Sequence, residues 1–200
     1  MPDISYTPTT ALVVVDMQND FADPQGNLYV PDGDQVVSVV NEAVRAARAA
    51  DATVVYTQDW HPPTTPHFAK DGGTWPVHCV ADTWGAQLHP DLDIDPAAPV
   101  VRKGVDGGDG YSGFSVRDPV SGERASTELG SHLEAAGVTR LVVTGLAADV
   151  CVKETALDGV RLGYEVVVPT GATRAVELEP GDGDRAMQEL RAAGVEVVGS

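Results

Sequence analysis

Short, uninterrupted apolar runs rich in β-branched residues recur along the chain. They occupy residues 11–15, 53–57, 100–101, 140–144, 165–168 and 195–198. Because these runs are continuous and do not alternate with polar residues, they are typical of strands that are covered on both faces. Apolar residues at helical spacing lie between them, over residues 35–50, 127–136 and 184–193. This alternation predicts an α/β fold with a largely parallel sheet and helices on both faces.

Length and charge restrict the classes of protein further. The chain has 200 residues, which predicts a single domain, and 13 basic against 30 acidic residues give a net charge of −17. Such a charge opposes broad electrostatic binding to nucleic acid or to an anionic membrane. No apolar run approaches the roughly 20 residues of a membrane span, and the start lacks a signal-peptide pattern. Two cysteines cannot form a disulfide framework, so we expect a cytoplasmic protein.

Residues 58–99 interrupt the regular pattern and are rich in Pro, Gly, Asp and His. Long irregular stretches inside compact domains are typically functional or disordered. This one holds Asp59, His61, His67 and His78, and the Asp-x-His pair projects both side chains toward one side of an extended segment. One carboxylate and up to three imidazoles suit a divalent ion such as zinc, iron or manganese. The alternative is that these residue types are simply common in polar loops.

Three reactive side chains follow apolar runs, where the carboxyl ends of parallel strands form a binding rim. Asp16 follows the first run, Lys103 follows the third, and Cys151 follows the fourth at the start of a predicted helix. The positive end of that helix favours a thiolate. A carboxylate can take the thiol proton while an ammonium holds the carboxylate in place. Singly, the three could be a helix cap, a surface charge and an inert buried cysteine, but together they predict nucleophilic catalysis.

A glycine-rich segment at residues 108–113 fits the G-x-G-x-x-G pattern of dinucleotide-binding loops. It lies beyond a middle strand and opens no clear helix, and Asp106 and Asp109 would repel a pyrophosphate. We therefore expect a loop here and no nucleotide site.

Several motifs resemble those of the nicotinamidase/pyrazinamidase family, within the isochorismatase-like cysteine hydrolases. They are Val15-Asp-Met-Gln-Asn-Asp-Phe21, Gln58-Asp-Trp-His-Pro62, Trp75-Pro-Val-His-Cys79, Arg102-Lys-Gly104, Tyr111-Ser-Gly-Phe114 and Thr144-Gly-Leu-Ala-Ala-Asp-Val-Cys-Val152. The resemblance covers most of the chain. It implies a three-layer αβα sandwich around a six-stranded, mainly parallel sheet, as one domain over 1–200 with a metal-binding irregular insertion at about 58–99.

The reaction that this resemblance implies is hydrolysis of nicotinamide to nicotinate and ammonia, and of pyrazinamide to pyrazinoate, through a thioester. Cys151 would be the nucleophile, Asp16 the general base and then acid, and Lys103 would position Asp16. The backbone N–H groups of Ala147 and Cys151 would form the oxyanion hole, beside a cis peptide bond between Leu146 and Ala147.

The resemblance also implies a metal and a small-molecule substrate. The metal would be divalent, most simply zinc, with iron or manganese as alternatives, and it would anchor the pyridine nitrogen. Its implied ligands are Asp59, His61, His78 and, as a fourth candidate, His67. Phe21 and Trp75 would sandwich the substrate ring, and Tyr111 would line the pocket.

Two other interpretations stay open at this point. The first is a related hydrolase acting on a ureido, carbamoyl or isochorismate substrate, although such enzymes usually lack the Asp-x-His and Trp-Pro-x-His motifs. The second is a non-catalytic zinc protein or thiol redox sensor, which would need no pairing of Asp16 with Lys103. The sequence also leaves a homo-oligomer open.

Overall fold

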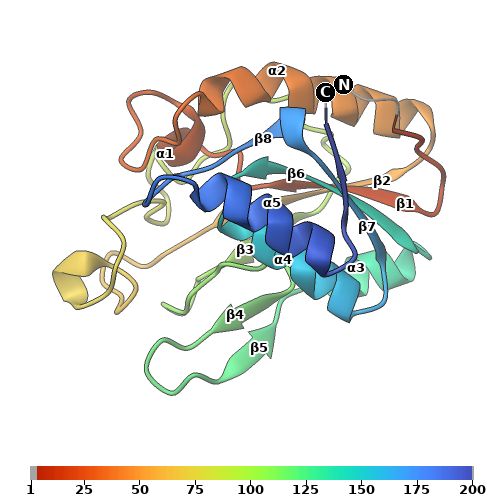
Figure 1. The fold of residues 1–200 in the computed structure, drawn as a ribbon. Helices are drawn as coiled ribbons and strands as arrows, with labels where there is room; N and C mark the ends of the chain where they lie inside the picture. The colour runs from red at the N-terminus through yellow and green to blue at the C-terminus, as the bar shows by residue number, and fades with distance from the viewer. Residues whose placement is uncertain (1–3, 200) are drawn as a thin grey trace.

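The computed structural model describes residues 4–199 and contains one central parallel sheet (Figure 1). Six of its strands lie side by side in the order β3-β2-β1-β6-β7-β9. Their bounds are β1 (Thr10–Val15), β2 (Thr53–Asp59), β3 (Val100–Lys103), β6 (Arg140–Leu146), β7 (Glu165–Pro169) and β9 (Glu196–Val198). These are the six runs that the sequence marks as strands, so the predicted α/β fold is confirmed.

A seventh strand, β8 (Thr173–Arg174), pairs in parallel with the end of β6. The sheet therefore has seven strands where the sequence predicts six. The difference has a simple reason, because a strand of two residues is too short to leave a pattern of apolar residues in the sequence.

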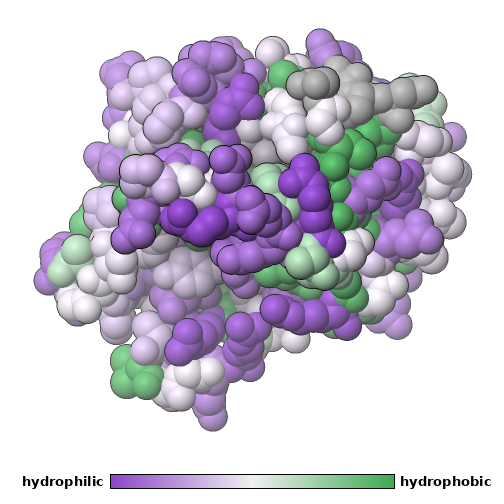
Figure 2. All heavy atoms as spheres, in the orientation of Figure 1, coloured by the Kyte–Doolittle hydropathy of each residue, from purple (hydrophilic) through white to green (hydrophobic). Residues whose placement is uncertain are grey.

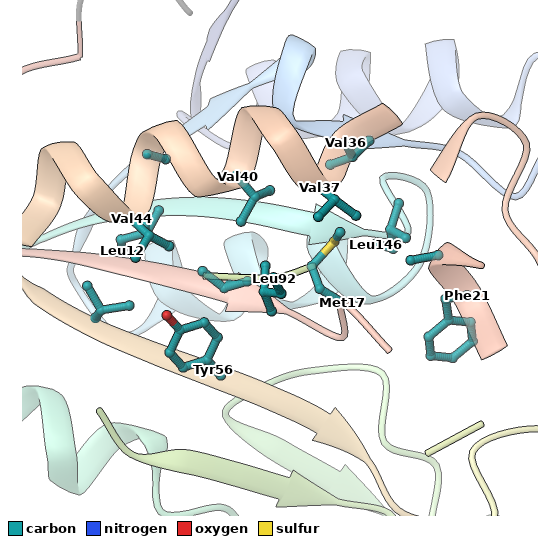
Figure 3. Close-up of a cluster of buried hydrophobic side chains, with 14 of the residues drawn as sticks. Leu12, Met17, Phe21, Val36, Val37, Val40, Val44, Tyr56, Leu92 and Leu146 are labelled. Carbon is teal, nitrogen blue, oxygen red and sulfur yellow. The ribbon is translucent and has the colours of Figure 1, made fainter. Parts of the chain in front are cut away.

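Helices cover both faces of the sheet and complete the predicted three layers (Figure 1). The helices are α1 (Asn19–Ala22), α2 (Gly33–Ala49), α3 (Leu129–Ala135), α4 (Cys151–Arg161) and α5 (Asp182–Ala192), with 3₁₀ turns η1 (Ala69–Asp71) and η2 (Thr170–Ala172). On one face, Val36, Val40 and Val44 of α2 point toward the sheet and share a core with Leu12 of β1 (Figure 3). On the other face, Val13 packs in a second core with α3, α4 and α5. Adjacent β1 residues thus serve opposite cores because side chains alternate along a strand.

The chain between β2 and β3 is irregular apart from η1, and a buried glutamine attaches it to the sheet. Gln18 Nε2 donates to the carbonyl oxygens of Asp59 (2.7 Å) and Ala86 (2.9 Å), while its Oε1 accepts from the backbone N–H of Asp59 (2.8 Å). Isolated bridges join His61 to Val80 and Phe68 to Trp75. The segment is therefore ordered by specific bonds and not by a regular element.

Between β3 and α3 the chain forms an antiparallel hairpin of β4 (Ser115–Arg117) and β5 (Arg124–Ser126), which the sequence analysis does not anticipate. Its residues are largely exposed, so they carry no apolar pattern. Among the described residues, none of the helices is long and apolar enough to cross a membrane. Figure 2 shows that the surface over α5 is mostly hydrophilic.

Candidate active site

The candidate active site lies where the strand order reverses. From β1 the chain builds β2 and β3 on one side, and β6, on the other side of β1, continues to β7 and β9. Asp16 directly follows β1, and Cys151 begins α4 after β6. On the adjacent strands, the parallel register pairs Asp59 with Lys103. Ligands of open α/β sheets bind at this switch point, beyond the carboxyl ends of the strands.

Lys103 is fully buried and lies at the centre of the reactive group. Its Nζ is 2.7 Å from Asp16 Oδ2 and 3.7 Å from Cys151 Sγ. The same ammonium also contacts Asp59 Oδ1 and donates to the carbonyl oxygen of Gly110. One cation therefore bridges two buried carboxylates and lies beside the thiol, so the three residues predicted from strand ends do meet.

For Asp59 and Lys103, pairing with opposite charges shifts the pKa more than burial does. Burial disfavours the ionised form of Asp59, but the Lys103 ammonium and the rings of His61 and His78 hold its pKa well below the usual range. Burial likewise disfavours a charged lysine, but the Asp16 and Asp59 carboxylates raise the pKa of Lys103 well above its usual value. Both groups are therefore ionised at neutral pH.

Asp16 and Cys151 behave differently. Burial raises the pKa of Asp16, although Lys103 opposes this, and burial also raises the pKa of the Cys151 thiol well above its usual value. Burial and the Asp16 and Asp59 carboxylates thus oppose the effect that the sequence analysis expects from the start of α4, while the Lys103 ammonium acts in the expected direction and lowers the pKa of the thiol. A neutral thiol close to a basic carboxylate suits proton transfer at the moment of attack.

Thr57 orients Asp16 and is missed by the sequence analysis. Its Oγ1 donates to Asp16 Oδ1 at 2.6 Å and accepts from the backbone N–H of Asp16 at 3.2 Å. Thr57 ends the apolar run at 53–57 and is itself buried, so nothing in the sequence separates it from an ordinary strand residue.

The predicted metal ligands converge on one buried cluster beside the lysine. One ring nitrogen each of His61, His67 and His78 lies within 4.8 Å of the others. Asp59 Oδ2 is 3.7 Å from His61 Nε2 and 3.8 Å from His78 Nε2. All four candidates from the sequence are thus brought together, including the fourth, His67.

The hydrogen bonding of these histidines fits a divalent metal. Both ring nitrogens of His61 are buried and have no hydrogen-bond partner within residues 4–199, which is costly unless another group binds them. His78 Nδ1 donates to the carbonyl oxygen of Pro76 (2.7 Å), which leaves Nε2 facing Asp59. Metal-bound histidines typically make such an outer bond. The nitrogen and oxygen donors suit zinc and iron.

A pocket connects the metal cluster to the thiol. Its lining includes the predicted ring-binding and oxyanion residues and three apolar residues that the sequence analysis misses. The lining residues are Phe21, Leu28, Asp59, His67, Trp75, His78, Tyr111, Ala147, Val150, Cys151 and Val176. Trp75 Nε1 donates to the Tyr111 hydroxyl at 3.0 Å. The expected cis peptide bond between Leu146 and Ala147 is present.

The glycine-rich loop lies against the ion pair of the site. Residues 108–113 open no helix, as expected. A Cβ atom at Gly110 would lie 2.9 Å from Asp59 Oδ1, so close approach to the ion pair explains the glycine. The Oδ1 of Asp109 lies 2.7 Å from His67 Nδ1, a contact that the spacing of the two residues in the sequence does not suggest.

Comparison with known proteins agrees with this geometry. The Isochorismatase domain family matches residues 10–200. The nicotinamidase of Escherichia coli (strain K12) is 39% identical over 203 residues, which cover 94% of this chain and 93% of that protein. The structure of the pyrazinamidase of Pyrococcus horikoshii in complex with zinc is 37% identical with a TM-score of 0.85, over 96% of this chain and 100% of that one. The structure of PnC1 from L. infantum in complex with nicotinate is 35% identical with a TM-score of 0.88, and the match covers 98% of this chain and 96% of that one. The chain therefore belongs to the isochorismatase family and, within it, to the nicotinamidase/pyrazinamidase group.

Proposed function

We propose that this protein hydrolyses nicotinamide to nicotinate and ammonia, and pyrazinamide to pyrazinoate, with Cys151 as the nucleophile. The observation that carries this proposal is the buried contact of Lys103 with both Asp16 and the thiol, where the thiol faces a pocket that His67 and His78 also line. A redox sensor or a structural zinc protein would not need that ion pair.

In the first half of the reaction, Cys151 Sγ attacks the carboxamide carbon while Asp16 takes the thiol proton. Asp16 then gives this proton to the amide nitrogen, the C–N bond breaks, and ammonia leaves a thioester behind. In the second half, Asp16 takes a proton from water, the hydroxide attacks the thioester, and the proton returns to the sulfur. Lys103 and Thr57 hold the carboxylate of Asp16 in place throughout.

The developing oxyanion is stabilised by the backbone N–H groups of Ala147 and Cys151, which line the pocket. Cys151 is the first residue of α4, and the first N–H groups of a helix have no acceptor inside it. They are therefore free to bind negative charge on the substrate oxygen. Donors of this kind typically contribute about 100- to 1000-fold in rate.

The substrate ring binds between the thiol and the histidines. Asp59, His61 and His78, with His67 as a fourth ligand, would hold a divalent metal, which we propose to be zinc. When bound, the metal supplies a Lewis acid that anchors the ring nitrogen of a pyridine or pyrazine. Residues of the pocket wall pack against the ring, namely Phe21, Trp75 and Tyr111.

A cytoplasmic location is part of the same proposal. Both cysteines of the chain, Cys79 and Cys151, are free thiols in the structure. A nucleophilic cysteine must stay reduced to act, and the cytoplasm keeps thiols reduced.

The test is ammonia release from nicotinamide by the purified protein, before and after chelation, with Cys151→Ala as the control. We expect release that depends on metal, disappears in Cys151→Ala, and is far slower with benzamide, which lacks a ring nitrogen. Absence of release from metal-loaded wild-type protein would contradict the proposal and direct the search to carbamoyl and ureido substrates.

A further inference from the structure

Two consecutive residues of the loop after β3 contact different parts of the site, one the metal cluster and the other the catalytic lysine. The carboxylate of Asp109 lies 2.7 Å from His67 Nδ1 in the metal cluster. The carbonyl oxygen of the next residue, Gly110, accepts from the Lys103 ammonium. The histidine and the lysine are thus tied to one short segment, and the contact with His67 has no part in the reaction steps described above.

Hydrogen bonds to β4 fix the backbone of Asp109. Its N–H donates to the carbonyl oxygen of Arg117 (2.6 Å), and the N–H of Arg117 donates back to its carbonyl oxygen (3.0 Å), which forms an antiparallel bridge to β4. On the other side, Thr65 Oγ1 donates to the carbonyl oxygen of Gly107 (2.6 Å) and accepts from the backbone N–H of His67 (3.2 Å). The carboxylate therefore meets the imidazole with both backbones anchored.

The chemistry of this contact determines which nitrogen of His67 can bind a metal. A carboxylate only accepts hydrogen bonds, so Nδ1 carries the proton of the neutral ring and Nε2 keeps its lone pair. The side chains of His67 and Asp109 are 3% and 13% exposed, so water competes little for this bond. Carboxylate partners of this kind fix the orientation of a ligating histidine and raise its basicity.

We propose that Asp109 is a positioning residue that orients His67 as the fourth protein ligand of the metal. This inference rests on the metal site of the proposed function. Two of the other ligands are oriented by groups other than Asp109, because His78 donates to a backbone carbonyl group and Asp59 contacts the Lys103 ammonium. The loop carboxylate should therefore affect metal affinity through His67 alone.

The test measures zinc affinity of the full-length protein by competition with a chromophoric chelator, without using enzymatic activity. The variants are Asp109→Ala, Asp109→Asn and His67→Ala, the double variant of Ala at both positions, and Asp106→Asn as the control. Asp106 lies in the same loop and is exposed. Circular dichroism of the metal-free proteins monitors folding, and the visible spectrum of Co²⁺-substituted protein monitors the ligand set.

We expect Asp109→Ala to bind zinc about 10- to 100-fold more weakly than wild type. Asp109→Asn should lose less, because its amide oxygen still accepts from Nδ1, and Asp106→Asn should match wild type. In the His67→Ala background, Asp109→Ala should not weaken zinc binding further, because the two residues act through one contact and their effects are then not additive.

Wild-type zinc affinity in both Asp109 variants, or an equal loss with and without His67, would overturn the inference. Zinc binding that weakens as expected in a protein that releases no ammonia would support this inference and contradict only the proposed activity. A wild-type protein that binds no zinc would overturn the metal site and this inference together.

Discussion

Replacing Lys103 with methionine removes the cation that lies between two buried carboxylates while keeping most of the side-chain volume. Lys103 Nζ lies 2.7 Å from Asp16 and also contacts Asp59, and all three side chains are almost completely buried. The variant leaves both carboxylates without their counterion. Breaking a buried pair in this way typically costs about 3–5 kcal/mol. For a domain of this size that loss lowers the melting temperature by about 6–20 °C.

The loss should depend on pH in a defined direction. In the wild type, the pKa of Asp59 in the folded protein lies below its value in the unfolded chain, which is about 3.9. Ionised Asp59 therefore stabilises the folded protein above the unfolded pKa, and this stabilisation is lost as pH falls through the folded pKa. Without Lys103, the pKa of Asp16, which burial already raises in the wild type, rises further, and burial raises the pKa of Asp59 above the unfolded value. The native variant then binds more protons than the unfolded chain, so its stability falls as pH rises. The difference from wild type should be largest near pH 8 and smaller near pH 5.

The assay is urea unfolding of metal-free protein, followed by circular dichroism at pH 5 and pH 8. Lys153→Met is the matched control, since Lys153 forms partly exposed pairs with Glu154 and Glu189 and should lose at most about 1 kcal/mol at either pH. A loss in Lys103→Met no greater than in the control, or one that is equal at both pH values, would refute the reasoning that the ammonium compensates two buried charges.

Two further substitutions test the geometry around the base. Thr57→Val removes a hydrogen bond that lowers the pKa of Asp16. The acidic limb of the pH profile of kcat/KM for nicotinamide should therefore move to higher pH, and kcat/KM should fall about 10- to 100-fold. A pH profile that does not move would show that Thr57 does not act on the base. Gly145→Ala would place a Cβ 2.0 Å from the carbonyl oxygen of Val15 at a φ of 102°, so we expect a loss of at least about 2 kcal/mol in urea unfolding. Gly137→Ala, with positive φ but open space, should lose only about 1–2 kcal/mol, and equal losses would argue against the close approach.

Much of the fold follows from local patterns that the chain carries in itself. A continuous apolar run such as residues 11–15 suits only a strand that is covered on both faces, and the stripe of Val36, Val40 and Val44 suits only a helix packed on one side. The rule that ligands bind at strand ends then selects Asp16 and Lys103 without knowledge of the strand order. The same dependence on local patterns explains what is missed. The strand β8 is too short, and the β4–β5 hairpin too exposed, to leave an apolar pattern in the sequence.

The sequence by itself therefore determined the α/β class, the six main strands and the residue types at the rim, because periodicity and strand ends are local properties. Only the tertiary structure decided which side chains meet. The register of β2 against β3 places Asp59 beside Lys103, and the fold of the irregular loops brings Asp109 to His67. It also decided the direction in which the pKa of Cys151 shifts, since this depends on burial and on charges from distant parts of the chain. Spacing along the sequence carries no information on such contacts, because they depend on how the strands are ordered and covered.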